Sequence, residues 1–305
     1  MKSAIVTGAN GFIGSAVCRA LLKRGVEVYA LVYAKDAFTG LGSHPNLRVL
    51  ESGMADYPAI APSLPQDADA FYHFAWEGSS GATLADYSMQ IRNIQYTCDA
   101  LTLAAQIHCK KFIMAGTINE LELLQFFHAE RQVPRPACIY GTAKLACDLM
   151  CKTIAAQKDI LFNCAIIGSC FGPGDRSKRI HNAFIHGMLV GKAPKLVQAE
   201  TLHDWIYIDD VADMFCEIGQ SGVHMKNYYL GHDHLRPLRD ILLEVRDILN
   251  PGLEIKFGEV PDSFVIDYSQ VEIDGVYRDT GYRCNSDFAE CIRKTAEHVK
   301  TLSWE

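Results

Sequence analysis

The sequence lacks a long hydrophobic run. Its 305 residues contain no uninterrupted apolar stretch of roughly 18 residues, the length that indicates a membrane-spanning helix. Residues 1–6 read as a short strand, and they carry neither the long apolar stretch nor the cleavage site of a secretory signal peptide. We therefore expect a cytoplasmic protein with no membrane partner.

An excess of positive charge is also absent. The chain has 29 lysines and arginines against 36 aspartates and glutamates, so its net charge is −7. A general nucleic-acid binder needs a basic surface, and we therefore expect no nucleic-acid partner. The hydrophobic share of 49% and the charged share of 21% are ordinary for a globular protein, and the length is ample for a well-packed core.

No spacing of cysteines or histidines compels a metal site. The eleven cysteines are scattered along the chain. Cys147 and Cys151 stand four apart on an expected helix, but they have no companion pair of ligands. We expect reduced, buried cysteines and no bound metal.

Strands and helices alternate in the first part of the chain. The expected strands cover 2–7, 26–32, 47–50, 70–74, 111–115 and 160–167, and the expected helices cover 12–24, 86–107 and 139–158. The strands are nearly continuous apolar runs, which fit a parallel sheet covered on both faces. The predicted fold class is α/β, with a doubly wound parallel sheet of the Rossmann type.

The alternation breaks after about residue 170. The turn Gly172-Pro173-Gly174 is followed by loops, by isolated strands over 205–208 and 227–230, and by a helix over 238–249. We expect residues 1–170 to form the core domain, with 205–222 returning to it. Residues 171–305 should form mainly a smaller, mixed cap that binds substrate.

A glycine-rich turn joins the first expected strand to the first expected helix, and its glycines are three apart. Gly8 permits the tight turn, Gly11 lets the backbone approach a pyrophosphate, and Gly14 lets the helix pack close to the strand. The helix N-terminus then offers N–H groups to the phosphates. The core domain 1–170 is thus predicted to bind NAD(P). The expected cofactor contacts in this turn are Gly8, Asn10, Gly11, Phe12, Ile13 and Gly14.

The end of the second expected strand bears on which dinucleotide binds. An acidic residue there would bind the ribose 2′-hydroxyl of NAD, but the chain continues Tyr33-Ala34-Lys35 and has no carboxylate until Asp36. Lys35 either faces a 2′-phosphate or is a solvated loop lysine. The sequence slightly favours NADP over NAD, with Tyr33 and Lys35 as cofactor contacts.

Tyr140 and Lys144 are four residues apart on an expected helix, so they share a face. A tyrosine has a pKa of about 10 in water, and a nearby ammonium favours the phenolate and lowers that pKa. The pair suits proton transfer to or from a hydroxyl or carbonyl oxygen. Thr117 follows a strand at the sheet edge where open α/β sheets bind ligands, and its hydroxyl can bond the reacting oxygen.

The order of these parts resembles the extended short-chain dehydrogenases/reductases, in the NAD-dependent epimerase/dehydratase family that acts on nucleotide sugars. The matching segments, within about residues 3–215, are the turn at 8–14, His73-Phe74-Ala75-Trp76, 93–97, Thr117, Tyr140 with Lys144, Phe171-Gly172-Pro173-Gly174 and 204–212. The resemblance implies that Thr117, Tyr140 and Lys144 form the catalytic triad. It also implies that Lys144 binds the nicotinamide ribose, that Ala75 lines the cofactor, and that Asn93 has a supporting structural role.

Departures from the family pattern carry information too. Family 4,6-dehydratases have an Asp-Glu pair just after the catalytic threonine, where this sequence has Ile118-Asn119. We therefore expect no 4,6-dehydratase activity. Met54 stands where the family usually has an aspartate near the adenine. Ser169 and His203 replace an asparagine and an arginine in the region that grips the nucleotide diphosphate.

A basic cluster of Arg176, Lys178 and Arg179 follows the Gly-Pro-Gly turn. Arginines bind a diphosphate through bidentate contacts, although the cluster equally fits a solvated loop. The expected substrate contacts are Trp76, Thr117, Ser169, Arg176, Arg179 and His203.

These residues predict an NAD(P)-dependent nucleotide-sugar oxidoreductase, either a 4-keto-sugar reductase or a 4-epimerase, with Tyr140 as the acid/base of hydride transfer. The alternatives are a reductase of a small non-sugar carbonyl compound and a catalytically silent, cofactor-sensing protein. The resemblance also implies a homodimer through helices 86–107 and 139–158, whose apolar stripes fit a sheet-facing core equally well.

Overall fold

The computed structural model describes the chain except for residues 35–40, 125, 127–132, 262–265 and 305. Its main sheet has seven strands in the order β10-β6-β5-β4-β1-β2-β3. They are β1 (Ser3–Thr7), β2 (Glu27–Val32), β3 (Leu47–Glu51), β4 (Ala70–His73), β5 (Lys111–Thr117), β6 (Leu161–Ile167) and β10 (Asn227–Leu230). Every neighbouring pair is parallel. The predicted α/β fold is therefore confirmed.

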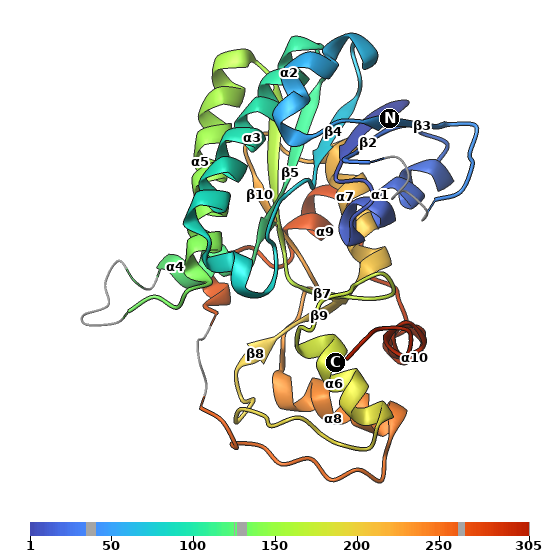
Figure 1. Cartoon of the computed structure of the whole chain (residues 1–305), viewed down its shortest axis with the longest axis vertical. Coiled ribbons are helices and arrows are strands. Elements are labelled where there is room, and N and C mark those ends of the chain that lie inside the picture. The colour runs from blue at the N-terminus through green and yellow to red at the C-terminus, as the bar shows by residue number, and fades with distance from the viewer. Residues whose placement is uncertain (35–40, 125, 127–132, 262–265, 305) are drawn as a thin grey trace.

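Helices cover both faces of this sheet (Figure 1). α1 (Phe12–Lys23) packs against α7 (Ile208–Ser221) on one face, and α3 (Tyr87–Gln106) packs against α5 (Cys138–Lys158) on the other. Side chains alternate along a strand, so the two faces carry separate buried clusters. Ala4 and Val6 belong to one cluster and Ile5 belongs to the other. The shorter helices α2 (Tyr57–Ile60) and α9 (Gly275–Thr280) pack against α3 and α7.

A smaller layer lies below the carboxyl ends of these strands (Figure 1). In it, β7 (Ser169–Phe171) pairs with β9 (Trp205–Tyr207), and β8 (Leu202–His203) pairs with β11 (Arg236–Pro237). The helices of this layer are α6 (Ile180–Leu189), α8 (Leu238–Leu249) and α10 (Phe288–Val299), which pack against one another. The division into two domains at residue 170 stays a prediction.

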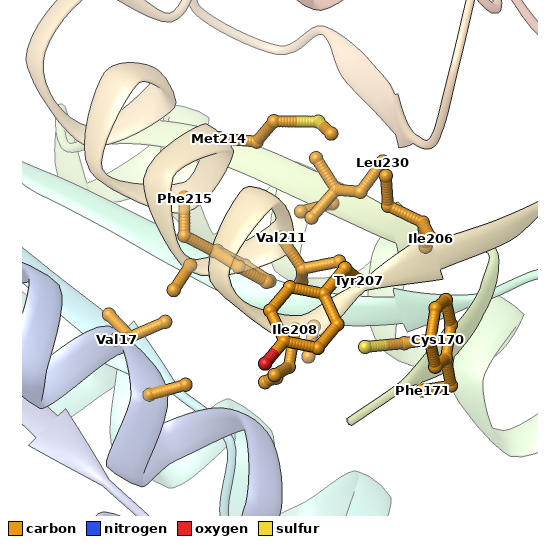
Figure 2. Packing of buried hydrophobic residues seen from close by; sticks show 14 of the residues in the cluster. Val17, Cys170, Phe171, Ile206, Tyr207, Ile208, Val211, Met214, Phe215 and Leu230 are labelled. Carbon is orange, nitrogen blue, oxygen red and sulfur yellow. The ribbon is translucent and has the colours of Figure 1, made fainter. Parts of the chain in front are cut away.

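Figure 2 shows where the two layers meet. Val211 and Phe215 of α7 lie in the same buried cluster as Tyr207 and Phe171 of the smaller layer, with Val17 of α1 close by. α7 follows β9 directly, and the chain then enters β10, which pairs with β6 in the main sheet. This continuous apolar cluster fixes the position of the smaller layer against the carboxyl end of the sheet.

Some elements differ from the sequence-based expectation. β5 runs on to Thr117 because it pairs with β6 as far as Ile167. The short helix α4 (Asn119–Leu124) follows it and was not expected. Short 3-10 turns at Met54–Asp56, Ala61–Ser63, Gly81–Ala85 and Tyr268–Gln270 complete the described secondary structure.

All eleven cysteines are free thiols, and all except the partly exposed Cys284 are buried. No helix among the described residues has both the length and the apolar character needed to cross a membrane.

Candidate active site

A cavity of about 730 Å³ opens at the carboxyl ends of β1, β4 and β5. β1 and β4 are neighbours at the point where the strand order reverses, which is where open α/β sheets bind their ligands. The predicted site residues that line it are Gly8, Asn10, Gly11, Phe12, Ile13, Gly14, Tyr33, Ala75, Trp76, Thr117, Tyr140, Lys144, Arg176 and Arg179. Lys35, a predicted cofactor contact, lies outside the described residues.

The glycine turn forms one wall of the cavity and has no room for side chains. Gly8 has a φ of +62°, and a Cβ there would come within 2.7 Å of the backbone nitrogen of Ala75. A Cβ on Gly14 would collide with the carbonyl oxygen of Gly8. Gly11 caps the N-terminus of α1, and its N–H donates to the carbonyl oxygen of Gly8 over 2.9 Å. The bare backbone beside a helix N-terminus forms a cradle that fits a pyrophosphate.

His73 supports the part of the cavity wall that lies directly against this turn. Its Nδ1 lies 2.9 Å from Thr7 Oγ1 and its Nε2 lies 3.2 Å from Thr97 Oγ1. Thr7 Oγ1 also accepts the N–H of Ala75 over 3.2 Å. Burial lowers the pKa of His73 to about 3, so the ring is neutral at physiological pH. His73 therefore acts as a structural hydrogen-bonding residue that fixes Ala75 at the cavity wall.

Another stretch of the cavity wall follows the ends of β2 and β3. Tyr33 is 81% exposed there, and Ser52, Met54 and Asp56 also line the cavity. Asp56 Oδ2 accepts the N–H of Gly53 over 3.2 Å. The sequence-based prediction considered Met54 in this segment but did not name Asp56 as a cavity residue. The available signal was a carboxylate shortly after the third strand.

Tyr140 lies in the first turn of α5 and is 8% exposed. Burial raises the pKa of Tyr140 to about 12, although the charge of Arg179 and a hydrogen bond with the Thr117 side chain oppose the rise. This direction is opposite to the lowering expected from Lys144, because the cost of burying a phenolate outweighs the neighbouring positive charge. Thr117 and Tyr140 thus have their hydroxyls together, and Tyr140 is protonated at neutral pH.

Lys144 lies one helical turn after Tyr140 and also lines the cavity. Its Nζ donates to the carbonyl oxygen of Ala115 over 2.8 Å and lies 3.7 Å from the centre of the Trp76 ring. The distance from this Nζ to the centre of the Tyr140 ring is 6.0 Å. Burial lowers the pKa of Lys144. The indole of Trp76 meets the Tyr140 ring edge-on, with ring centres 5.8 Å apart.

Two buried amides of α3 hold the loop that carries Trp76. Gln90 Oε1 accepts the indole N–H of Trp76 over 2.9 Å, and its Nε2 donates to the carbonyl oxygen of Gly78 over 3.0 Å. Asn93 exchanges two hydrogen bonds with the backbone of Glu77, of 3.0 and 2.8 Å. This geometry fits the supporting role that the resemblance implies for Asn93.

The basic cluster closes the cavity from the smaller layer. Arg179 Nη2 donates to the carbonyl oxygen of Ser79 over 2.8 Å, which ties the start of α6 to the Trp76 loop. Asp175 stabilises the turn that precedes α6, because its carboxylate accepts both the N–H and the hydroxyl of Ser177. Arg176 and Arg179 both reach the cavity wall and can bind a phosphate-bearing ligand there.

Two predicted substrate contacts lie elsewhere. Ser169 begins β7 and pairs with Trp205, and His203 ends β8 and pairs with Arg236. Neither Ser169 nor His203 is among the described residues that line the cavity. Both residues lie in the smaller layer, and Gly168 and Cys170 on either side of Ser169 do line the cavity, so the two substrate contacts stay predictions.

Sequence reasoning also missed several polar residues of the wall, among them Glu77, Tyr96 and Asp175. Glu77 directly follows the His73–Trp76 segment and Tyr96 lies within the 93–97 match, so both stood inside the segments that carried the resemblance. Asp175 directly follows the Gly-Pro-Gly turn, and its role becomes visible through the hydrogen bonds of the folded turn.

Comparison with known proteins bears on the family to which the chain belongs. Residues 4–231 match the model of the NAD dependent epimerase/dehydratase family. A dTDP-glucose 4,6-dehydratase of Mycolicibacterium smegmatis is 24% identical over 254 residues, which is 78% of this chain and 76% of that protein. UDP-glucuronate 4-epimerase 6 of Arabidopsis thaliana is 23% identical over 328 residues, which is 96% of this chain and 70% of that protein.

A solved structure of the Bordetella bronchiseptica enzyme WbmF in complex with NAD+ shares the fold. Its TM-score is 0.77 at 19% identity, covering 98% of this chain and 92% of that chain. Because the family model spans most of the sequence, from β1 to the end of β10, the chain belongs to the NAD-dependent epimerase/dehydratase family.

Proposed function

We propose that the protein is a nicotinamide-dependent nucleotide-sugar oxidoreductase, either a 4-keto-sugar reductase or a 4-epimerase. The observation that carries this proposal is the meeting of the Thr117 and Tyr140 hydroxyls, with Lys144 beside them, in a cavity whose wall includes the glycine turn. The crowded backbone at Gly8 and Gly14 fits the pyrophosphate of a dinucleotide. The relatives described above are a dTDP-glucose 4,6-dehydratase and a UDP-glucuronate 4-epimerase, which supports a nucleotide sugar as the substrate class here.

The chain's own residues divide the work of the reaction. A bound nicotinamide supplies hydride transfer to or from a sugar carbon. Tyr140 gives its hydroxyl proton to the carbonyl oxygen in reduction, or takes the proton from the hydroxyl in oxidation. Thr117 hydrogen-bonds the same oxygen, and the Lys144 ammonium stabilises negative charge as it develops on Tyr140.

The protonation state of Tyr140 is compatible with both reactions. Burial raises its pKa to about 12, so the residue is a proton donor at neutral pH, as a tyrosine with its ordinary pKa of about 10 would be. A reductase uses this proton directly, whereas a 4-epimerase must first move it away so that Tyr140 can accept the proton of the sugar hydroxyl. The two differ in their use of cofactor, since a reductase consumes NAD(P)H stoichiometrically and an epimerase shows no net turnover.

The choice between NAD and NADP depends on the end of the cavity near Tyr33. The sequence slightly favours NADP through Lys35, which lies outside the described residues. Asp56 adds a carboxylate to this wall, which suits a ribose 2′-hydroxyl better than a 2′-phosphate. The Bordetella relative was solved with NAD+. Together these observations move the proposal toward NAD, and titration with NADH and NADPH compares the two directly.

The segment after Thr117 argues against a 4,6-dehydratase. Ile118 and Asn119 occupy the places of the Asp-Glu pair. The next residue, Glu120, does carry a carboxyl, but it is buried and accepts the N–H of Thr117. Glu120 is not among the described residues that line the cavity. We expect no 4-keto-6-deoxy product from dTDP-glucose, which is the substrate in the names of several relatives.

The substrate contacts that the geometry favours are Trp76, Arg176 and Arg179. The Trp76 indole stands beside Tyr140, where the apolar face of a sugar ring can pack against it. Arg176 and Arg179 give the cavity two cations for a diphosphate. The proposal therefore orients the sugar toward Tyr140 and the diphosphate toward the start of α6.

We also propose that a second copy of the chain packs against α3 and α5. Large apolar side chains are exposed on these two helices: Tyr87 and Ile91 on α3 are 66% and 59% exposed, and Leu149 and Met150 on α5 are 58% and 46% exposed. Other apolar residues of the same helices, such as Cys98 and Leu101, already face the core. Each helix thus packs one apolar face against the sheet and exposes further apolar residues to solvent. Such an exposed apolar surface supports the expected homodimer.

The experiment that tests the proposed function is a thermal-shift screen of UDP- and dTDP-sugars, each with NAD(H) or NADP(H) present. A ligand that binds the folded state raises the melting temperature. The proposal expects stabilisation by a dinucleotide and a further rise with a nucleotide-sugar that is then turned over. Stabilisation by a free carbonyl compound but by no nucleotide-sugar would instead support reduction of a small non-sugar carbonyl.

A further inference from the structure

A buried carboxylate lies behind the candidate catalytic strand end. Glu120, in the first turn of α4, is 3% exposed, and its Oε1 accepts the N–H of Thr117 over 2.7 Å. It is not among the described residues lining the cavity, so it has no direct path to a substrate. Burying a carboxylate is costly unless it is hydrogen-bonded and paired with a charge. Its position therefore calls for a role other than acid/base chemistry.

Gly116 makes room for this carboxylate. A Cβ on Gly116 would lie 2.9 Å from Glu120 Oε1 and 2.8 Å from the Sγ of Cys164. Both distances are shorter than real Cβ contacts allow. A residue with a side chain at position 116 would push the Glu120 carboxylate away from Thr117. The lack of a side chain at Gly116 is therefore what lets the Glu120 carboxylate reach the N–H of Thr117.

Glu120 is the carboxylate whose negative charge acts on the ammonium of Lys144. The titratable and charged groups facing it are Tyr140, Lys144, Cys147, Asp148 and Lys152 of α5 and Cys164 of β6. Asp148 Oδ2 is already bound by Lys152 Nζ over 3.0 Å and by Asn227 Nδ2 over 2.7 Å. Glu120 is then the remaining carboxylate of the cluster that can balance the buried ammonium of Lys144.

Glu120 and Lys144 also hold neighbouring parts of the same strand. Lys144 Nζ donates to the carbonyl oxygen of Ala115, and Glu120 accepts the N–H of Thr117, two residues further along β5. We propose that Glu120 is a positioning residue, whose carboxylate fixes the backbone of Thr117 and keeps Lys144 charged at the reacting group. This inference rests on the proposed function, in which Thr117 and Lys144 act on the sugar oxygen and the nicotinamide ribose.

The charge of Glu120 should affect the pH at which Lys144 and Tyr140 lose their protons. Burial raises the pKa of Glu120 to about 7, although the Thr117 N–H and the charges of Lys144 and Lys152 oppose the rise. The ionised carboxylate in turn raises the pKa of Lys144 and of Tyr140. Removing the negative charge should therefore let Lys144 and Tyr140 lose their protons at lower pH.

The test uses Glu120→Gln, which keeps an oxygen to accept the Thr117 N–H but removes the charge. The matched control is Glu122→Gln, the same change in the same helix, where the carboxylate pairs with Arg135 over 2.6 Å. The probe is NADH, whose dissociation constant is measured by fluorescence from about pH 6 to about pH 10, the range that brackets the titrations of interest. In the proposed function the Lys144 ammonium would hold the nicotinamide ribose, so its loss of a proton should weaken NADH binding at alkaline pH.

In Glu120→Gln the alkaline weakening of NADH binding should move to lower pH by about one unit. Glu122→Gln should follow the wild type. Glu120→Asp keeps the charge at a shorter reach, and it should show a smaller shift in the same direction. A Glu120→Gln profile that coincides with the wild type would overturn the proposal.

If Glu120→Gln fails to fold, Glu120→Asp decides the question, and the absence of any shift in that variant also overturns the proposal. A wild-type protein that binds neither NADH nor NADPH at any pH refutes the proposed function itself, which separates the two failures.

Discussion

The ammonium of Lys144 lies 3.7 Å from the centre of the Trp76 ring, and the indole N–H of Trp76 is fixed by Gln90. A cation over an indole face is stabilised by the electrons of the ring, more strongly where water is excluded. Burial lowers the pKa of Lys144, so the indole helps to keep this buried side chain charged. The loop after β4 therefore contributes to the charge state of a residue on α5.

The first prediction concerns this contact. Trp76→Ala should lower the turnover of the nucleotide-sugar found in the screen by about tenfold, the rate equivalent of a desolvated cation–π contact. Trp76→Phe keeps a ring and should lose less. The control is Trp304→Phe, since Trp304 stacks on His186 in the smaller layer, with ring centres 4.2 Å apart. Wild-type turnover in Trp76→Ala would contradict the role assigned to the indole.

The second prediction concerns the glycine turn. Gly14→Ala should weaken NADH binding by about tenfold or more, because the new methyl group displaces the carbonyl of Gly8 from the pyrophosphate cradle. Gly252→Ala is the control, since a Cβ there meets no atom within 4 Å. Isothermal titration with NADH compares the two variants. Equal affinity in Gly14→Ala and Gly252→Ala would show that the cofactor does not use this turn.

The third prediction concerns stability and pH. Burial lowers the pKa of His232, but the hydrogen bond to Asp204 and its charge outweigh burial, so the net pKa is raised. A raised folded-state pKa stabilises the fold below the unfolded value of about 6.5, and this stability is lost as pH rises through the folded-state pKa. His232→Asn should therefore lower the melting temperature by about 2 °C in mildly acidic buffer, and by less in alkaline buffer.

His234→Asn is the matched control for this change, because the His234 side chain is 68% exposed and bonds its neighbour Asp233. It should alter the melting temperature little at either pH. A loss in His232→Asn that is equal in acidic and alkaline buffer would mean that the charged pair with Asp204 contributes nothing.

The fourth prediction concerns the proposed dimer. Leu149→Glu places a charge among the exposed apolar side chains of α3 and α5, where Leu149 is 58% exposed. Burying that charge in an interface is unfavourable, so light scattering at micromolar concentration should give the variant the molar mass of a monomer. Val223→Glu makes the same kind of change at a 52% exposed residue after α7, and it should leave the oligomeric state unchanged. A wild-type protein that is itself a monomer would contradict the proposed dimer.

Much of the sheet could be predicted from the sequence because local signals agree there. β1 and β6 are nearly continuous apolar runs, and the turn after β1 has glycines at positions where the structure has no room for a Cβ. The Tyr140–Lys144 spacing correctly placed both residues on one helix at the cavity. These features depend on neighbours in sequence.

The parts that escaped prediction depend on tertiary contacts. The direction of the Tyr140 pKa shift follows from burial, which residue spacing does not reveal. The pairing of Ser169 with Trp205 and of His203 with Arg236 joins segments far apart in the sequence, which the sequence pattern does not reveal. The sequence-based prediction did not name Glu120, and its contact with Thr117 depends on α4, a helix that was not expected, lying beside β5.

The most direct test of the central claim is turnover by Tyr140→Phe, measured by NAD(P)H absorbance with the nucleotide-sugar that stabilises the wild type. Product is analysed in parallel, so that an epimerase without net cofactor turnover is also detected. The variant should bind NADH as the wild type does but lose nearly all turnover, because phenylalanine fills the site without a proton to exchange. Turnover near the wild-type rate would contradict the assignment of Tyr140 as the acid/base.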